Sequence, residues 1–497
     1  MPDSYDQIPY PSLPFRQTHP ERLATLAILF GLQPAPADRS RVLEIGCADG
    51  GNLIPMACNY PGSTFLGIDT AKEMVRAGCG QIAALGLANI RLIPMDVMDA
   101  GPALGEFDYI LAHGFYSWVP EPVRDKLLAA ASALLAPQGV AYVSYNALPG
   151  CHIRRMFREM LLFHVRETVA PDARIQADTE LLACFTESPQ EGGEFGSILK
   201  TEARFLLDQN PAVLFHDELA EIYHPVYVHE FLAHASRHGM RFLAESNYHE
   251  MASLRYPRHV IERVKQWTAG DTVLRQLYAD FLKCRTFRQT LLCHEALPVS
   301  PEPLPDRIHS LYAASSAEPV SREPDLREGV AEEFRGYKGA AAKTDHPLAK
   351  AALLTLSRAW PQAVAFPDLL AAAGRLTGAE PDPGALTEIL IGTYGAGLSE
   401  LHSEPARCIS AAGPFPQTTP LVRWQAAQGK IVTTCLHTTI EATGETERRL
   451  LQLLDGTRNL AALTAELQPL LDQPEEMVAA EIRDNLARLA RFGLLVA

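Results

Sequence analysis

The sequence predicts an α/β fold with a mostly parallel sheet, followed by a mostly helical C-terminal region. Two observations carry this prediction. Residues 42–146 alternate between short apolar runs and helical segments, and such alternation implies parallel strands joined by right-handed crossovers. The first apolar run ends in a glycine-rich turn, which is typical of a strand that feeds a ligand-binding loop and a helix.

The glycine-rich turn is the strongest functional signal. Residues 42–52 read VLEIGCADGGN, so that Glu44 precedes Gly46 and Gly50 in the order E-x-G-x-x-x-G. Glycine takes backbone conformations closed to other residues and lets the chain approach a ligand. The order departs from the GxGxxG of dinucleotide-binding proteins. It resembles motif I of class I S-adenosylmethionine (SAM) methyltransferases, which implies that the loop holds the methionine part of SAM.

Acidic residues end the next two predicted strands. Residues 65–69 end in Asp69, and an acid about twenty residues past such a loop can accept hydrogen bonds from both ribose hydroxyls. Residues 90–97 contain Asp96, and the resemblance implies that this acid accepts from the adenine amino group. The alternative is a generic NAD-binding domain, but the spacing of glycines and acids favours SAM. The expected cofactor-binding residues are Glu44, Gly46, Cys47, Gly50, Asp69, Asp96, Val97 and His113.

Candidates for the acceptor side follow predicted strands four (107–113) and five (139–146). A lysine acceptor must lose its proton, which burial favours, and aromatic faces tolerate a methylammonium product. His113 is a candidate general base for a hydroxyl or carboxyl acceptor, or a structural histidine beside the cofactor. Trp118 has core packing as its alternative role. The expected catalytic residues are Tyr116, Trp118, Tyr145, Asn146 and His113.

The remaining sequence predicts two helical insertions in the sheet and a separate C-terminal region. The sixth and seventh strands are predicted at 240–244 and 288–293, and a closing strand at 493–496. The insertions are expected to dimerise the protein or to cover the active site. The predicted parts are a Rossmann-like SAM-binding core with an N-terminal lid (1–150), a helical insertion (151–215), a regulatory region that completes the sheet (216–298), a proline-rich linker (299–345) and a helical, winged-helix-like region (346–497).

Several short motifs carry a closer resemblance, which covers essentially the whole chain. It begins with Tyr5, Asp6, Pro9 and Tyr10, then Pro14-Phe15 and Thr18-His19-Pro20. It continues with HGFYSWVP at 113–120, SYN and PG within 144–150, FH-x-ELA at 215–220 and FRQTLLC at 287–293. These match bacterial methyltransferases with a methyltransferase regulatory domain, and the chain is similar to the rickettsial protein lysine methyltransferases among them.

Composition and charge limit the classes of partner, compartment and cofactor that we expect. The net charge of −15 disfavours nucleic acid through repulsion from phosphates. Nine cysteines without a CxxC pair are typical of reduced thiols in a cytoplasmic protein. No apolar run approaches the ~20 residues of a spanning helix, so we expect no membrane insertion. No His/Cys/Asp cluster has metal-ligand spacing, so we expect no metal. The resemblance implies SAM as the cofactor and S-adenosylhomocysteine as its product.

These observations favour a SAM-dependent enzyme that N-methylates a protein or peptide amine, preferably lysine. A small-molecule O- or N-methyltransferase whose extra domains dimerise is the first alternative. A SAM-binding interaction protein without catalysis is the second. Residues 410–497 are expected to dock an extended acceptor peptide and to matter little for SAM.

Overall fold

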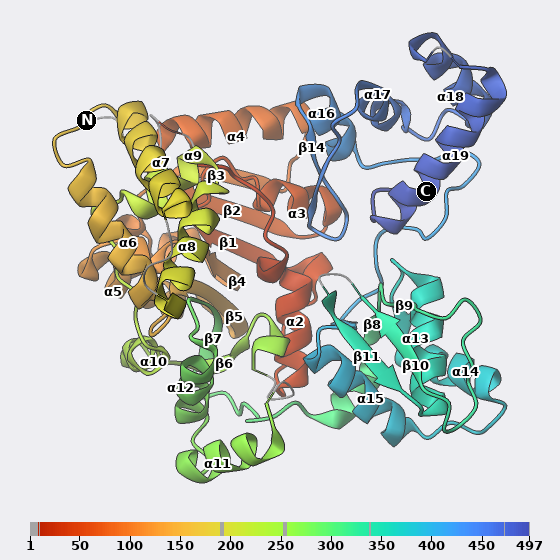
Figure 1. Ribbon diagram of the computed structural model, residues 1–497, viewed down its shortest axis with the longest axis horizontal. Coiled ribbons are helices and arrows are strands. Elements are labelled where there is room, and N and C mark those ends of the chain that lie inside the picture. The colour runs from red at the N-terminus through yellow and green to blue at the C-terminus, as the bar shows by residue number, and fades with distance from the viewer. Residues whose placement is uncertain are drawn as a thin grey trace.

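The computed structural model describes residues 8, 10–188, 193–251, 256–336, 339–471 and 473–496 (Figure 1). Of the N-terminal motif, Tyr5, Asp6 and Pro9 lie outside the described residues. A seven-stranded sheet forms the first half of the chain, in the order β3-β2-β1-β4-β5-β7-β6. Only β7 runs against its neighbours. The strands are β1 (Arg41–Ile45), β2 (Thr64–Asp69), β3 (Ile90–Pro94), β4 (Phe107–Ala112), β5 (Leu135–Asn146), β6 (Met240–Glu245) and β7 (Phe287–His294).

Helices cover both faces of this sheet, because alternate residues of each strand point to opposite sides. On one face, Val42 packs with Leu23 and Leu53 of the helices there. On the other face, Leu43 packs with Phe231 and its neighbours. The first face is covered by helices that include α2 (Pro20–Leu29) and α3 (Leu53–Asn59). The second face is covered by α5 (Glu121–Leu134) and α10 (Val228–Arg237). Helix α4 (Lys72–Leu85) connects β2 to β3.

The prediction that two late segments complete the sheet is confirmed. Strand β7 pairs antiparallel with β5, and β6 pairs antiparallel with β7. A fully buried Arg288 fixes this edge from inside: its Nη1 lies 2.6 Å from Oε1 of Glu245 and its Nε lies 2.8 Å from Oδ2 of Asp280. Buried charges persist only when they are paired, so this ion cluster ties β6 and β7 to helix α12 (Thr272–Lys283).

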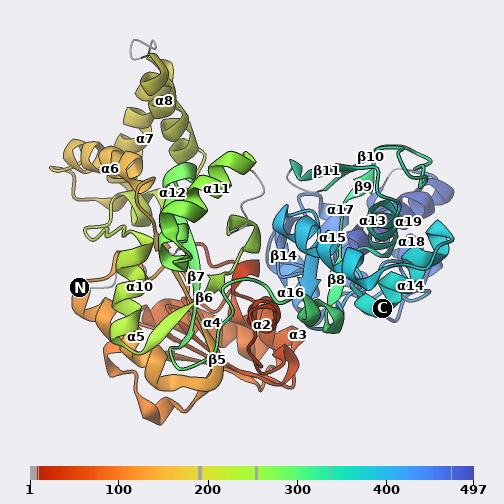
Figure 2. The ribbon, with the colours of Figure 1, turned by 90° about the horizontal axis from the view of Figure 1, so that it is seen from below.

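The helices between β5 and α10 form a cluster with its own apolar core around Phe157, Leu182 and Leu206. Figure 2 shows α7 and α8 projecting away from the sheet. The helix α11 (Arg258–Thr268) lies between β6 and α12. The helices of the first insertion are α6 (Cys151–His164), α7 (Pro171–Glu187), α8 (Gly193–Leu207) and α9 (Pro211–Val213), followed by the π-helix η6 (Leu214–Glu218).

The segment 299–345, expected as a linker, differs from that expectation because it contains strands that pair with later parts of the chain. Strand β8 (Tyr312–Ala314) pairs with β12 (Val364–Ala365) and β13 (Glu400–His402). The other strands of this segment are β9 (Glu318–Pro319), β10 (Glu332–Arg335) and β11 (Ala341–Thr344), which form a second three-stranded sheet. The helices α13 (Pro347–Ala359), α14 (Phe366–Thr377) and α15 (Pro383–Gly395) complete this part.

The C-terminal part has a separate apolar core around Val432, Leu451 and Leu489. The expected closing strand at 493–496 is reduced to a single bridge between Leu495 and Thr418, since Gly493 (φ 70°) turns the chain just before it. The elements are α16 (Pro420–Gln428), β14 (Ile431–Thr433), β15 (Thr439–Glu441), α17 (Glu445–Leu453), α18 (Leu460–Leu467) and α19 (Glu475–Arg491).

Figure 2 shows two lobes, with the sheet and its insertions in one and residues after β7 in the other. Helix α2 lies between the sheet and the second lobe in both views. Among the described residues, no helix combines the length and apolar character that crossing a membrane requires.

Candidate cofactor and acceptor site

The glycine-rich loop connects β1 to α3 at the carboxyl edge of the sheet. Gly46 and Gly50 have φ of 79° and 80°, a region that L side chains rarely adopt. A Cβ on Gly46 would also lie 2.9 Å from the Phe115 ring. Asp69 at the end of β2 braces the loop, because its Oδ2 accepts from the backbone N of Ala48 at 2.8 Å. The sequence therefore folds locally into a tight turn that Asp69 holds in place.

Glu44 is the buried acid of this site. Its Oε1 accepts from Nδ2 of Asn52 at 2.7 Å, while its buried Oε2 has no partner among the described residues. Burial, with the nearby negative charge of Asp69, raises the pKa of Glu44 to about 8. An unpaired buried carboxylate oxygen fits a cationic partner, since burying it alone is costly. The amino group and sulfonium of SAM are cations, so these residues fit that cofactor.

Asn52, directly after the loop, joins three distant parts of the chain. Its Oδ1 accepts from the backbone N of Phe15 and from Nε2 of His437, each at 2.9 Å. Its Nδ2 donates to Glu44 and, at 3.0 Å, to Oγ1 of Thr18. Asn52 is nearly fully buried, so these contacts fix the orientation of its amide.

The N-terminal segment around Ser12 and Phe15 lies on the loop. Oγ of Ser12 accepts from the backbone N of Gly51 at 3.0 Å, and a Cβ on Gly51 would lie 2.5 Å from the Ser12 carbonyl. The Phe15 ring lies 4.0 Å from that of His113 between centroids. Residues 12–15, part of the segment expected as a lid, therefore lie against the glycine-rich loop.

The other expected cofactor residues lie around the same edge. Both oxygens of Asp69 accept backbone N–H groups, from Ala48 and, at 2.9 Å, from Ala71. Asp69 therefore fixes the backbone on both sides of the carboxyl edge of β2. Asp96 is exposed and caps the turn after β3 by accepting from Met98 at 2.9 Å, while Val97 and Cys47 are buried.

His113 follows β4 and points to the neighbouring strand. Its Nδ1 lies 2.9 Å from the hydroxyl of Tyr142, and burial lowers its pKa to about 4. His113 is therefore neutral near pH 7. Its ring is packed between Phe15 and the exposed Phe287, the latter with centroids 6.0 Å apart. These contacts favour a role for His113 as part of the wall of the site over a role as a general base.

The structure places two expected acceptor-facing residues inside the core. Tyr116 is 3% exposed and its hydroxyl lies 2.8 Å from Nδ1 of His234. Tyr145 is 1% exposed, stacks on Phe231 at 4.1 Å and bonds Thr290 at 3.1 Å. Strand alternation explains the difference, because Tyr145 shares the α10 face with Val143. We assign both tyrosines a packing role.

Trp118 contacts the first insertion, and Asn146 ends strand β5. The Trp118 ring lies 5.3 Å from that of Tyr223 and 5.7 Å from the Arg158 guanidinium. Asn146 is buried, and its Nδ2 has no partner among the described residues. Its backbone N donates to Oγ of Ser117 at 2.9 Å. The unpartnered, buried Nδ2 keeps Asn146 a candidate for orienting an acceptor.

Sequence reasoning missed Asn52, His437, Phe15 and Phe287 as individual site residues. Asn52 could have been found from its position directly after the glycine-rich loop, and Phe15 from its place in the N-terminal motif. His437 had none, because it lies 385 residues from its partner Asn52.

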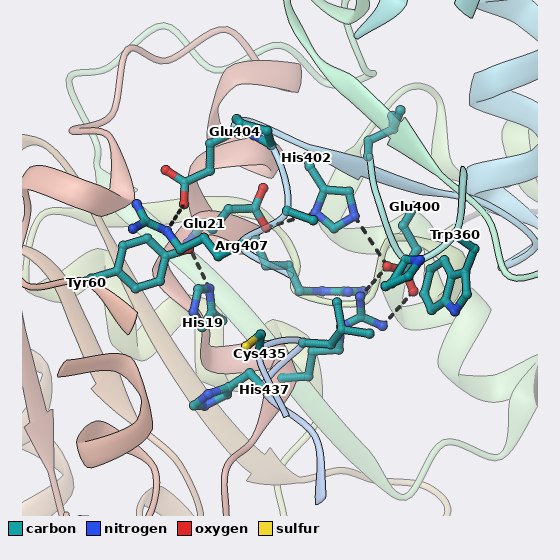
Figure 3. A pocket seen from close by; sticks show the side chains of 17 residues that line it. His19, Glu21, Tyr60, Trp360, Glu400, His402, Glu404, Arg407, Cys435 and His437 are labelled. Atoms are coloured by element: carbon teal, nitrogen blue, oxygen red, sulfur yellow. Dashed lines mark hydrogen bonds and ion pairs between the residues drawn. The ribbon is translucent and has the colours of Figure 1, made fainter. Parts of the chain in front are cut away.

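A cavity of ≈ 60 Å³ lies between the two lobes, lined by residues of α2, β13 and the turn after β14 (Figure 3). This volume is far below the about 300–1,000 Å³ of small-molecule sites, so the cavity is not the cofactor site. Arg16 pairs with Glu400 through its two Nη atoms, with Nη1 2.6 Å from Oε1. These contacts make the cavity a charged junction between the lobes.

One group of potential metal ligands occurs among the described residues. Asp125, His234 and His238 place one ligand atom each within 4.8 Å of one another. The Nε2 atoms of His238 and His234 lie 2.9 Å and 3.2 Å from the same Asp125 oxygen. These hydrogen bonds account for the arrangement, so we assign no metal to it. The sequence spacing could not reveal it, since Asp125 and His234 are on different helices.

Three family models match this chain. Residues 42–139 match "Methyltransferase domain", and residues 210–294 match "Predicted methyltransferase regulatory domain". Residues 415–491 match "PKMT, C-terminal winged helix domain". The matches cover the glycine-rich loop, the strands that close the sheet, and the region of His437.

Two uncharacterised proteins of Rickettsia prowazekii are similar in sequence. RP789 is 37% identical over 360 residues, which are 71% of this chain and 65% of that protein, less than two thirds of its length. RP028 is 35% identical over 241 residues, which are 48% of this chain and 96% of that protein. Among solved structures, PKMT2 from Rickettsia typhi matches 98% of this chain and 100% of its own, with a TM-score of 0.89 and 26% identity. One structure of PKMT2 is a complex with AdoHcy.

Proposed function

Because this chain belongs to the SAM-dependent methyltransferases that carry a methyltransferase regulatory domain, we propose that it methylates an amine of a protein or peptide, with lysine as the favoured acceptor. One observation carries this proposal above the others. The similarity to PKMT2 runs through the whole chain, including the C-terminal winged helix. A small-molecule enzyme would use the extra lobe only for dimerisation, whereas a protein acceptor can also dock on it.

We place the cofactor at the loop between β1 and α3. SAM, when bound, supplies the electrophilic methyl group. Asn52 holds Oε1 of Glu44, which leaves the unpaired Oε2 to meet a cationic group of SAM in this proposal. Asp69 holds the loop through Ala48, and we propose that its carboxylate accepts hydrogen bonds from the ribose hydroxyls. We propose that Asp96 and Val97, which follow β3, contact the adenine of SAM.

The acceptor is proposed to approach the aromatic wall of Phe15, His113 and Phe287. These rings lie side by side, with centroids 4.0 Å and 6.0 Å from that of His113. Aromatic faces exclude water and attract an ammonium product, while an apolar wall favours the neutral amine that attacks. Methyl transfer in line from sulfur depends mainly on such positioning. Asn146 and Trp118 are proposed further along the acceptor path.

The test uses methyl-labelled SAM with the full-length protein and a lysate of cells that lack it. The expected result is label in the protein fraction, on lysine side chains identified by mass spectrometry of peptides. An Asp69→Ala variant should label less and serves as the control for enzyme dependence. Label confined to small molecules would refute the protein acceptor and favour the alternative enzyme class. An absence of any transfer, with SAM bound, would favour the interaction protein.

We also propose a cytoplasmic protein that forms a homodimer. The nine cysteines are all unpaired, which suits a reducing compartment. Large exposed apolar side chains, including Phe163, Phe195 and Phe205 of the insertion, suit a second copy. Light scattering after gel filtration would decide the oligomeric state.

A further inference from the structure

The turn between β14 and β15 reaches Asn52, the residue directly after the glycine-rich loop. Figure 1 shows this hairpin beside α3, far along the chain from the glycine-rich loop. His437 at its tip is 2% exposed. The turn is rigid: Thr434 accepts at its carbonyl from the His437 N–H at 3.0 Å, and its N–H donates to the Thr438 carbonyl at 2.8 Å. His437 has φ of 56°, so the backbone holds a conformation uncommon for its side chain.

The hydrogen-bond pattern fixes which nitrogen of His437 carries the proton. Oδ1 of Asn52 already accepts from the Phe15 N–H, so it is an acceptor for Nε2 as well. Nε2 therefore donates, and Nδ1 has no partner among the described residues. Burial, with smaller contributions from the neighbouring His19 and from Arg16, lowers the pKa of His437 well below its ordinary value. The imidazole is a neutral, single donor.

Two donors on Oδ1 determine which end of the Asn52 amide faces Glu44. With Phe15 and His437 on the oxygen, the NH₂ end points at Oε1 of Glu44 at 2.7 Å. A rotated amide would set an oxygen against that carboxylate. Phe15 of the N-terminal segment and His437 of the C-terminal part therefore donate to the same amide oxygen.

We propose that His437 is a positioning residue for the cofactor, holding Asn52 so that the second oxygen of Glu44 stays available to the cationic end of SAM. This inference rests on the proposed cofactor site. It changes one expectation from the sequence, namely that residues 410–497 matter little for SAM. The C-terminal lobe instead supplies a hydrogen bond to the cofactor loop.

The experiment measures SAM affinity of full-length variants by calorimetry. His437→Phe keeps a buried ring and removes the donor, and His437→Ala removes both; each should weaken SAM roughly three- to tenfold, as expected for one lost hydrogen bond. His437→Gln restores an N–H donor and should recover most of the affinity. Cys435→Ala changes the same turn without touching Asn52 and should bind like the wild type.

Unchanged affinity in a folded donorless variant would overturn the proposal, as would an equal loss in His437→Gln or Cys435→Ala. Two donorless variants are included so that misfolding of one leaves the other to decide, with melting temperature without SAM as the folding check. Wild-type protein that does not bind SAM would refute the proposed function itself. Wild-type binding that weakens in Glu44→Gln but not in the His437 variants would refute only this inference.

Discussion

Oε2 of Glu21 lies 3.1 Å from Nδ1 of His402, which joins helix α2 of the sheet lobe to strand β13 of the second lobe. The same carboxylate accepts from the backbone N of Ser403 at 2.7 Å. Although burial opposes the charged form, Glu21 and Glu400 raise the pKa of His402 to about 9. Burial also opposes charge on Glu21, but His402 lowers its pKa to about 2. The junction is a buried ion cluster.

Stability should therefore depend on pH through this pair. The folded pKa of His402 is raised, so its contribution is complete below about 6.5 and is lost as pH rises through about 9. The folded pKa of Glu21 is lowered, so its contribution is complete above 4.5 and is lost as pH falls through about 2. His402→Gln should lower the free energy of unfolding by ~3 kcal/mol at pH 6. Urea titrations at pH 6 and pH 10 should show a smaller difference at the higher pH.

The control for this prediction is His259→Gln, because His259 is exposed on α11. It should unfold like the wild type at both values of pH. A cost for His402→Gln that is equal at pH 6 and pH 10 would show that the charge of His402 is not the stabilising feature.

SAM binding should release protons at pH 7. Free Glu44 has a pKa of about 8, raised by burial, so it is mostly protonated at pH 7, and a cation beside Oε2 favours the ionised form. Calorimetry in two buffers of different ionisation enthalpy measures the release. The Glu44→Gln variant should release fewer protons and bind SAM more weakly; equal release would mean that Glu44 does not meet the cofactor.

The same residue makes a prediction for the unbound protein. A folded pKa above the ordinary 4.5 means that the folded state holds an extra proton between about 4.5 and 8. Glu44 therefore costs stability as pH rises through this window. Thermal unfolding should show Glu44→Gln gaining stability over the wild type at pH 8 and little at pH 4.5.

Asp69 should be a main determinant of SAM affinity. Asp69→Ala removes the brace on Ala48 as well as acceptors for the ribose, so the loss should be on the order of 1.5–3 kcal/mol of binding free energy. Asp99→Ala, at an exposed acid after β3, is the matched control and should bind normally. Unchanged affinity of Asp69→Ala would remove this residue from the cofactor site.

Phe287 and Tyr116 make a matched pair for the acceptor side. Phe287 is 39% exposed at the aromatic wall, whereas Tyr116 is 3% exposed. Phe287→Ala should raise the Michaelis constant for a peptide acceptor and leave SAM affinity unchanged. Tyr116→Phe should keep the kinetics and cost about 1 kcal/mol of stability, because only the bond to His234 is lost. If Tyr116→Phe raised the Michaelis constant and Phe287→Ala did not, Tyr116 would be an acceptor-facing residue.

The sheet could be predicted because its signals are local. The glycine-rich turn and the acids at strand ends each lie within a few residues, and the segments at 240–244 and 288–293 supplied the strands that the sheet still lacked. Strand β8 was not predictable in this way. It is three residues long and pairs with β12 and β13, which follow much later in the chain.

The site was predictable at the loop and less so at its walls. Glu44, Gly46, Gly50 and Asp69 gather where strand ends meet. The orientation of Tyr145 depended on which face of β5 meets α10, which the apolar residues on both faces of that strand concealed. The contact of His437 depended on how two lobes dock, and no local pattern encodes it.

The contacts of Asn52 also impose an order in time. Phe15 leaves the ribosome before Asn52, but His437 follows 385 residues later. At about 5–20 residues per second, the nascent amide waits roughly 20–80 s for its final donor. The glycine-rich loop is thus among the first parts of this protein to be synthesised and among the last to be completed.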